Sequence, residues 1–140
     1  MDRIRLIASD MDATLLDRQS RLPVDFAGMV KRLAQLGIHF AAASGRPLYT
    51  LEEMFPDLRR EMILIGDNGG AARWQGKDLF VSEMPAEGWR KLARSTKQAG
   101  DVGLLCGLQA AYAEKRDEKY DKVFKKFYTR VEYVDELTAV

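Results

Sequence analysis

The chain is poor in the residues that disulfide-linked, histidine-dependent and membrane-spanning proteins rely on. Its single cysteine, Cys106, excludes a disulfide framework and fits a reduced, cytoplasmic setting. Its single histidine, His39, argues against a histidine-based metal site or catalytic triad. No apolar run approaches the roughly 18 residues of a membrane-spanning helix. The net charge is only +1, which argues against binding nucleic acid through bulk charge. We therefore expect neither a membrane nor a nucleic-acid partner.

Hydrophobic residues make up 46% of the 140 residues, so the chain can form a real core. Near its start, the apolar run Ile4–Ala8 predicts a buried strand, and Asp10 and Asp12 follow at its carboxyl end. Alternation would place both carboxylates on one side, with Met11 turned away. Two such charges repel each other unless a cation such as Mg²⁺ lies between them. A carboxylate beside Mg²⁺ can attack phosphorus, and a second can move protons. An aspartate-rich turn after a strand is the simpler alternative for this triplet alone.

A second strand repeats this arrangement of polar residues after an apolar run. Helical spacing of apolar residues after Pro23 predicts a helix that stops near Gly37, and Ile38–Ala43 predicts the next buried strand. Together with the first strand this makes a βαβ unit. Ser44, Gly45 and Arg46 follow at the strand end, where hydroxyl and backbone N–H groups can donate to phosphoryl oxygens. An exposed Gly-Arg-Pro turn is the alternative.

The remaining sequence predicts a third strand, a hairpin and a second region of different character. Met62–Ile65 indicates the third strand, and the Asn68-Gly69 step is typical of a turn. From about Met84 the order of predicted elements is helix, strand, strand, helix, strand, and its second helix is expected over Lys115–Phe127. Lysines alternate with acidic residues on the outer face of that helix, which favours a solvated surface over a binding patch.

Three stretches together resemble one enzyme superfamily. Asp10-Met11-Asp12-Ala13-Thr14-Leu15-Leu16-Asp17 closely resembles the first motif of the haloacid dehalogenase (HAD) superfamily, with Ala13 where that family usually has glycine. The string from Ser44 to Pro47 resembles the second motif in the form found in Cof-type (type IIB) members, and Asn68 matches their asparagine. The resemblance implies an α/β fold: residues 1–83 as the N-terminal part of a Rossmann-like core, parallel strands with flanking helices, and residues 84–140 as the first part of an α/β cap domain.

The resemblance also implies an activity and roles for seven residues. It implies a Mg²⁺-dependent phosphatase that acts on small phosphorylated metabolites, such as sugar phosphates, through an aspartyl-phosphate. Asp10 would be the nucleophile and Asp12 the general acid/base, and both would contribute to the metal site. The remaining residues would support the loop or bind phosphate and substrate: Thr14, Ser44, Gly45, Arg46 and Asn68.

Two further motifs of a full HAD phosphatase are not recognisable in the chain. One supplies a lysine and the other the acidic residues that complete the metal site. The resemblance thus covers only the first half of a full member, and we expect the chain to be truncated and inactive alone. We also expect it to associate with itself or with a missing C-terminal segment, because a half-core leaves strand edges uncovered. A non-enzymatic half-HAD fragment or association module is the alternative. A phosphoaccepting signalling domain fits Asp10-x-Asp12-x-Thr14 poorly.

Overall fold

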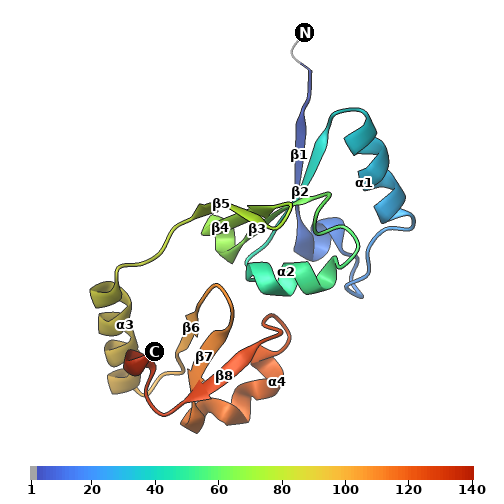
Figure 1. Ribbon diagram of the computed structural model, residues 1–140. Helices are drawn as coiled ribbons and strands as arrows, with labels where there is room; N and C mark the ends of the chain where they lie inside the picture. The colour runs from blue at the N-terminus through green and yellow to red at the C-terminus, as the bar shows by residue number, and fades with distance from the viewer. Residues whose placement is uncertain (1–2) are drawn as a thin grey trace. The chain divides into compact units, whose positions relative to one another are not determined.

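The computed structural model describes residues 3–140, and the chain divides into two compact units (Figure 1). The first unit ends at Val81 and the second covers Ser82–Val140. Each unit has its own sheet. No helix within residues 3–140 is both long enough and apolar enough to cross a membrane.

The sheet of the first unit is mixed, with three parallel strands followed by an antiparallel hairpin. Its strands lie in chain order, with β1 at one edge and β5 at the other. The predicted α/β class with parallel strands and flanking helices is confirmed. The five strands are β1 (Leu6–Asp10), β2 (His39–Ala43), β3 (Ile63–Gly66), β4 (Ala71–Trp74) and β5 (Lys77–Val81).

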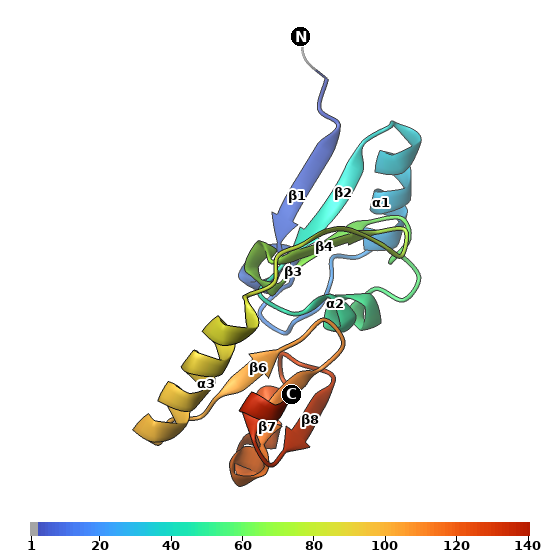
Figure 2. The same cartoon turned by 60° about the vertical axis from the view of Figure 1, so that its left-hand side comes forward.

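Two helices connect the parallel strands and supply much of the core. Helix α1 (Phe26–Gln35) joins β1 to β2, and α2 (Leu48–Met54) joins β2 to β3. Phe26 packs edge-on against Phe40 of β2, with ring centroids 5.5 Å apart, and lies 5.9 Å from the ring of Phe55. These aromatic contacts tie both helices to β2, which is the central parallel strand. Figure 2 shows α1 lying along the side of β2.

The expectation that the first strand is buried is wrong. Leu6 is 51% exposed and Ile7 is 37% exposed, and the strand begins two residues later than predicted. The physical reason is that β1 is an edge strand. Among residues 3–140 it pairs only with β2, so it has neighbours on one side only and its side chains are less covered than those of β2. A parallel strand normally has both faces covered. By contrast, Phe40, Ala41 and Ala42 of β2 are buried as expected.

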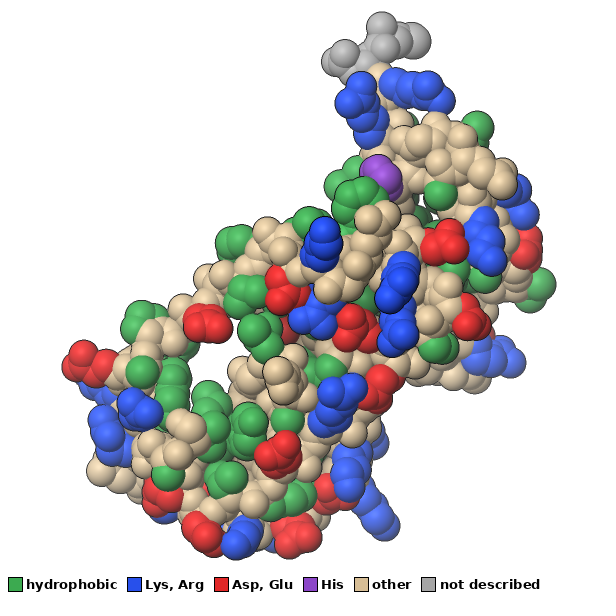
Figure 3. Space-filling view, viewed as in Figure 1, with side chains coloured by type: hydrophobic (Ala, Val, Ile, Leu, Met, Phe, Trp, Pro, Cys, Tyr) green, Lys and Arg blue, Asp and Glu red, His purple; other side chains and the backbone are tan. Residues whose placement is uncertain are grey.

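The second unit combines helix α3 (Ala86–Ala99) with a three-stranded sheet. Strand β7 (Ala111–Glu114) is central: it pairs antiparallel with β6 (Leu104–Cys106) and parallel with β8 (Val131–Val134). The last segment is a short 3₁₀ turn, η4 (Leu137–Ala139). The observed order of elements therefore follows the predicted helix, two strands, helical segment and strand. Hydrophobic side chains remain visible on the surface in this unit (Figure 3).

The predicted helix over Lys115–Phe127 is only partly correct. The segment forms a 3₁₀ turn, η3 (Lys115–Tyr120), followed by a short helix, α4 (Asp121–Phe124). Apolar side chains that a continuous helix would place on one face are also exposed, with Val123 at 53% and Phe127 at 47%. Instead of a stripe, the buried residues of this unit include Glu114 and Asp117. Arg116 pairs with Glu114 at 2.9 Å and approaches Asp117 at 3.8 Å, so the start of this segment is organised around charged groups as well as apolar ones.

Candidate active site

Three loops meet at one end of the first sheet, where the parallel strands β1, β2 and β3 reach their carboxyl ends. Asp10, the last residue of β1, pairs in register with Ala43 of β2, and Ala43 pairs with Ile65 of β3. Because carboxyl ends of parallel strands share an edge, the residues that follow each strand lie near one another. The predicted site residues are distributed over these three loops.

The first loop follows Asp10, the last residue of β1, and forms a wide turn, η1 (Met11–Leu15), that contains Asp12 and has non-helical backbone angles at Asp12 and Ala13. The turn is closed by the backbone N–H of Leu16, which donates to the Met11 carbonyl at 2.8 Å. Met11 is fully buried, whereas Asp10 and Asp12 are exposed, so the two carboxylates turn away from the core as predicted. The Thr14 hydroxyl donates to Asp10 Oδ2 at 3.1 Å. This hydrogen bond fixes one of the two carboxylate oxygens of the exposed Asp10.

Ala13 lies between the carboxylates and Thr14 in a left-handed backbone conformation, with φ of 58° and ψ of 11°. L-residues other than glycine enter this region at a cost of roughly 1 kcal/mol or more, because Cβ approaches the following carbonyl. The glycine that the resembled motif carries here would avoid that cost. The loop thus adopts the glycine conformation although the residue is alanine.

The second loop begins directly after β2 and is held by Ser44. The Ser44 side chain is only 8% exposed, and its backbone N–H donates to the Ile65 carbonyl at 2.9 Å. The Ser44 hydroxyl accepts from the backbone N–H of Arg46 at 3.1 Å. The hydroxyl hydrogen is still able to donate, as phosphate binding requires.

Arg46 reaches from this second loop to the first one. Its Nη2 donates to Asp12 Oδ1 at 2.8 Å, and its Nη1 approaches the Met54 sulfur at 3.2 Å. The arginine side chain is 13% exposed and that of Asp12 is 57% exposed. The guanidinium therefore pairs with the second carboxylate, a contact that sequence reasoning missed because the two residues are 34 positions apart.

The third loop, after β3, lies against the second. The backbone N–H of Asn68 donates to the Ser44 carbonyl at 3.2 Å, and that of Asp67 donates to the Arg46 carbonyl at 3.0 Å. A Cβ built on Gly45 would lie 3.0 Å from Asn68 Oδ1, so the glycine lets the amide come close. Asp67 was not predicted as a site residue. Its half-burial disfavours the charged form and raises the pKa of its carboxyl.

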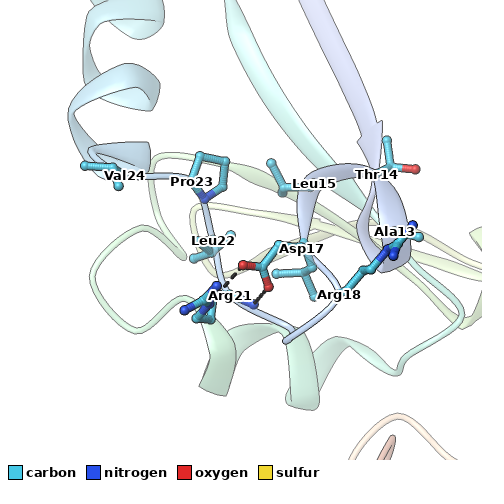
Figure 4. Close-up of a pocket in the computed structure, with 10 residues that line it drawn as sticks. Ala13, Thr14, Leu15, Asp17, Arg18, Arg21, Leu22, Pro23 and Val24 are labelled. Atoms are coloured by element: carbon cyan, nitrogen blue, oxygen red, sulfur yellow. Dashed lines mark hydrogen bonds and ion pairs between the residues drawn. The ribbon is translucent and has the colours of Figure 1, made fainter.

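A groove with a volume of about 900 Å³ lies beside the first loop (Figure 4). Asp17 accepts hydrogen bonds within the segment that lines this groove. The backbone N–H of Arg21 is the main cause of the lowered pKa of the Asp17 carboxyl. Burial opposes this lowering, whereas the Arg21 side chain and the Gln19 N–H add to it. The groove is lined by residues of one continuous stretch, Ala13, Thr14, Leu15, Leu16, Asp17, Arg18, Arg21, Leu22, Pro23 and Val24.

The donor set for a metal ion is small. Asp10 and Asp12 offer carboxylate oxygens, the kind of ligand that Mg²⁺ prefers. Within residues 3–140, however, no group of three or more His, Cys, Asp or Glu side chains is placed to share a metal. Arg46 also occupies one oxygen of Asp12. The described residues therefore begin a magnesium site without completing it.

An α/β sheet with two carboxylates after its first strand and a buried serine after its second defines the class of HAD-like hydrolases. A model of that family, haloacid dehalogenase-like hydrolase, matches residues 7–139, and the chain belongs to this family. The predicted superfamily is thereby confirmed. Among curated relatives, the chain is 33% identical to the 5-amino-6-(5-phospho-D-ribitylamino)uracil phosphatase of Escherichia coli K12, over 94% of this chain and 50% of that protein.

Solved structures show the same fold. The crystal structure of SMU.1108c from Streptococcus mutans UA159 matches with a TM-score of 0.88 at 25% identity, covering 99% of this chain and 53% of that one. The HAD subclass IIB sugar phosphatase BT4131 matches with a TM-score of 0.72 at 20% identity, over 94% of this chain and 52% of that one. The chain thus spans about half the length of each of these three relatives.

Proposed function

We propose that this chain carries the nucleophile and phosphate-binding parts of a cytoplasmic phosphatase that hydrolyses small phosphorylated metabolites. The observation that carries the proposal is the convergence of Asp10, Asp12, Ser44 and Asn68 at the shared end of three parallel strands. The activities named for two relatives, on a phosphorylated ribitylaminouracil and on sugar phosphates, support a small metabolite as substrate. In this proposal residues 1–83 belong to the core domain and residues 84–140 to the cap domain.

The residues divide the reaction between them. Asp10 Oδ1 attacks phosphorus, forming an aspartyl-phosphate as the bond to the ester oxygen breaks. Asp12 protonates that departing oxygen, then accepts a proton from the water that hydrolyses the aspartyl-phosphate. Thr14 holds Asp10 Oδ2 and thereby directs Oδ1 outward. The Ser44 hydroxyl, with Gly45 and Asn68 beside it, binds the phosphoryl oxygens.

Mg²⁺ is the cofactor we propose, bound by the Asp10 carboxylate and the backbone carbonyl of Asp12 together with ligands from outside residues 3–140. When bound, it would neutralise charge on the phosphoryl oxygens. Mg²⁺ usually keeps several waters and is bound through one or two carboxylates plus substrate phosphate, so these two residues would supply part of its near-octahedral oxygen shell. We therefore assign the steps above only to this chain's own side chains.

The test is the Asp10→Asn variant with a generic aryl phosphate. Asp10→Asn removes the nucleophile, so turnover and the acid-stable, hydroxylamine-sensitive phosphoenzyme should both disappear. Asp57→Asn is the matched control, because Asp57 is an exposed aspartate outside the three loops, and it should retain both. Turnover retained by Asp10→Asn would sink the assignment.

A non-enzymatic association module is the second candidate. Two observations within residues 3–140 favour it: no group of three or more His, Cys, Asp or Glu side chains is placed to share a metal, and β1 pairs with a strand on one side only. Intact mass spectrometry after incubation with an acyl phosphate donor distinguishes the candidates. A phosphorylated Asp10 supports the phosphatase, whereas a chain that never takes up phosphate but associates in light scattering supports the module.

A further inference from the structure

We propose that Arg46 is a positioning residue for Asp12: it fixes one carboxylate oxygen, Oδ1, so that proton transfer runs through the other, Oδ2. This inference rests on the proposed phosphatase function and changes the role of Arg46, which resemblance alone would assign to the substrate's phosphate. The contact between Arg46 Nη2 and Asp12 Oδ1, at 2.8 Å, is its starting point.

The two partners of this ion pair differ in burial, which shows which one holds the other. Asp12 is 57% exposed and belongs to a loop in a strained conformation, whereas Arg46 is 13% exposed. The Arg46 guanidinium is packed against the sulfur of Met54 on α2, 3.2 Å from Nη1. A largely buried, anchored cation can hold an exposed carboxylate in one orientation, at a cost in the rotamer freedom of that carboxylate.

The backbone of Arg46 is anchored at both of its polar groups. Its N–H donates to Ser44 Oγ at 3.1 Å, and its carbonyl accepts from the backbone N–H of Asp67 at 3.0 Å. The position of the guanidinium is therefore set by the loops after β2 and β3, which include the proposed phosphate-binding serine. Arg46 thus aligns Asp12 with the phosphate-binding loop, although the two belong to different strands.

The restraint has a chemical consequence. With Oδ1 accepting from Arg46, Oδ2 is the carboxylate oxygen of Asp12 through which a proton is exchanged with the substrate. The Oδ2–H bond breaks as the ester oxygen leaves phosphorus with the bonding electron pair and takes that proton. In the second half of the reaction, Oδ2 takes a proton from water as the water oxygen bonds to phosphorus and Asp10 is released. No further reactant is needed.

A kinetic test compares two leaving groups in Arg46→Met. Loss of a positioned acid hurts a poor alkyl leaving group far more than 4-nitrophenolate, which departs without a proton. We expect kcat for an alkyl phosphate to fall at least about tenfold, kcat for 4-nitrophenyl phosphate to fall less than about threefold, and KM to stay unchanged. Arg46→Lys should restore part of the loss. A raised KM with equal loss of kcat on both substrates would overturn the proposal and make Arg46 a phosphate ligand.

A second measurement does not depend on turnover. Three-bond couplings from Asp12 Cγ to its backbone nitrogen and carbonyl carbon report the side-chain rotamer. We expect single-rotamer values in the wild type and averaged values in Arg46→Met. Arg73→Met is the matched control. Like Arg46, Arg73 forms ion pairs, but its partners Glu52 and Asp78 lie away from the three loops. Unchanged Asp12 couplings in Arg46→Met would refute the positioning role.

The two measurements separate the proposals. Absence of wild-type turnover on both substrates would agree with the expectation that this chain is inactive alone, and it would count against the proposed function only if Asp10 also took up no phosphate from an acyl phosphate donor. The couplings would still decide whether Arg46 holds Asp12.

Discussion

Ala13 is the residue at which the site loop stores backbone strain. Its φ of 58° is a conformation that glycine adopts freely and alanine does not. The strain falls within the turn that places Asp10, Asp12 and Thr14, so the cost is borne by the loop that carries the proposed chemistry.

We predict that Ala13→Gly raises the free energy of unfolding by roughly 0.5–1 kcal/mol, since relief of strain exceeds the entropy that glycine adds to the unfolded chain. Urea titration followed by circular dichroism measures the change. Ala34→Gly, on the exposed face of α1, is the matched control and should lower the same free energy by about 1 kcal/mol. A destabilised Ala13→Gly variant would contradict the strain.

Among the elements, β7 carries the most charged environment in the second unit. The Glu114 carboxylate is 5% exposed and contacts Lys97 Nζ of α3 at 3.1 Å and Arg116 Nε at 2.9 Å. Lys97 also pairs with Glu136, so one lysine links α3, β7 and the segment before η4. Burial disfavours the charged form of Glu114 and acts to raise the pKa of its carboxyl. Hydrogen bonds from Lys97 and the Leu137 N–H, together with the charge of Arg116, outweigh burial and lower that pKa.

This lowered pKa predicts an acid-sensitive second unit. The stabilisation is fully present above the ordinary pKa of glutamate and is lost as pH falls through the lowered folded pKa. Trp89 fluorescence in a Trp74→Phe background should therefore report weaker stability at pH 3 than at pH 6. Glu114→Gln should lower the free energy of unfolding at pH 6 by about 1–3 kcal/mol and flatten the pH dependence. Glu132→Gln, on the exposed side of β8, should leave both unchanged within about 0.5 kcal/mol. An equal acid response in Glu114→Gln would refute the assignment.

The bounds of elements with a regular hydrophobic period were predictable from the sequence. The form of the segment after Lys115 and the exposure of β1 were not. The run Val131–Val134 predicts β8 with its correct bounds, and the apolar spacing from Phe26 to Leu33 predicts most of α1. The segment from Lys115 onward has a helical apolar period, yet it forms a 3₁₀ turn and a short helix in which Asp117 is buried while Val123 and Phe127 are exposed. The exposure of Leu6 likewise depends on which strands are present, which an apolar run cannot reveal.

For the candidate site, the motifs that follow the predicted strands were sufficient to predict that these residues lie near one another. The structure places Asp10, Ser44 and Asn68 at the carboxyl ends of the parallel strands, as their positions after apolar runs suggest. The pairing of Arg46 with Asp12 and the half-buried Asp67 were not predictable, because both depend on how separate loops pack. The roles of the seven predicted residues in catalysis and binding stay predictions.

At the scale of the whole molecule, β1 is one of the two edge strands of the first sheet. Within residues 3–140 no strand pairs with its outer edge, and Leu6 and Ile7 are exposed beside it. Edge strands of this kind invite pairing with another chain. We propose that the chain associates through β1, with another copy of itself or with a segment like the unmatched half of its relatives.

We predict an average mass above that of a monomer in light scattering, rising with concentration. Leu6→Lys should shift the average mass toward the monomer, because a charge on an edge strand opposes pairing. Leu79→Lys, at the exposed face of β5 on the opposite sheet edge, is the matched control and should not change the association. A wild-type chain that stays monomeric at all concentrations would contradict the role of β1.

The same edge has a consequence for hydrogen exchange. In a strand paired on one side only, alternate backbone N–H groups point to solvent and exchange with deuterons without any unfolding. Strand β2, paired on both sides, protects its amides far better. The strand that ends in Asp10 is thus the least protected of the three parallel strands. A partner that covers it would be detected first as slowed deuterium uptake immediately upstream of the proposed nucleophile.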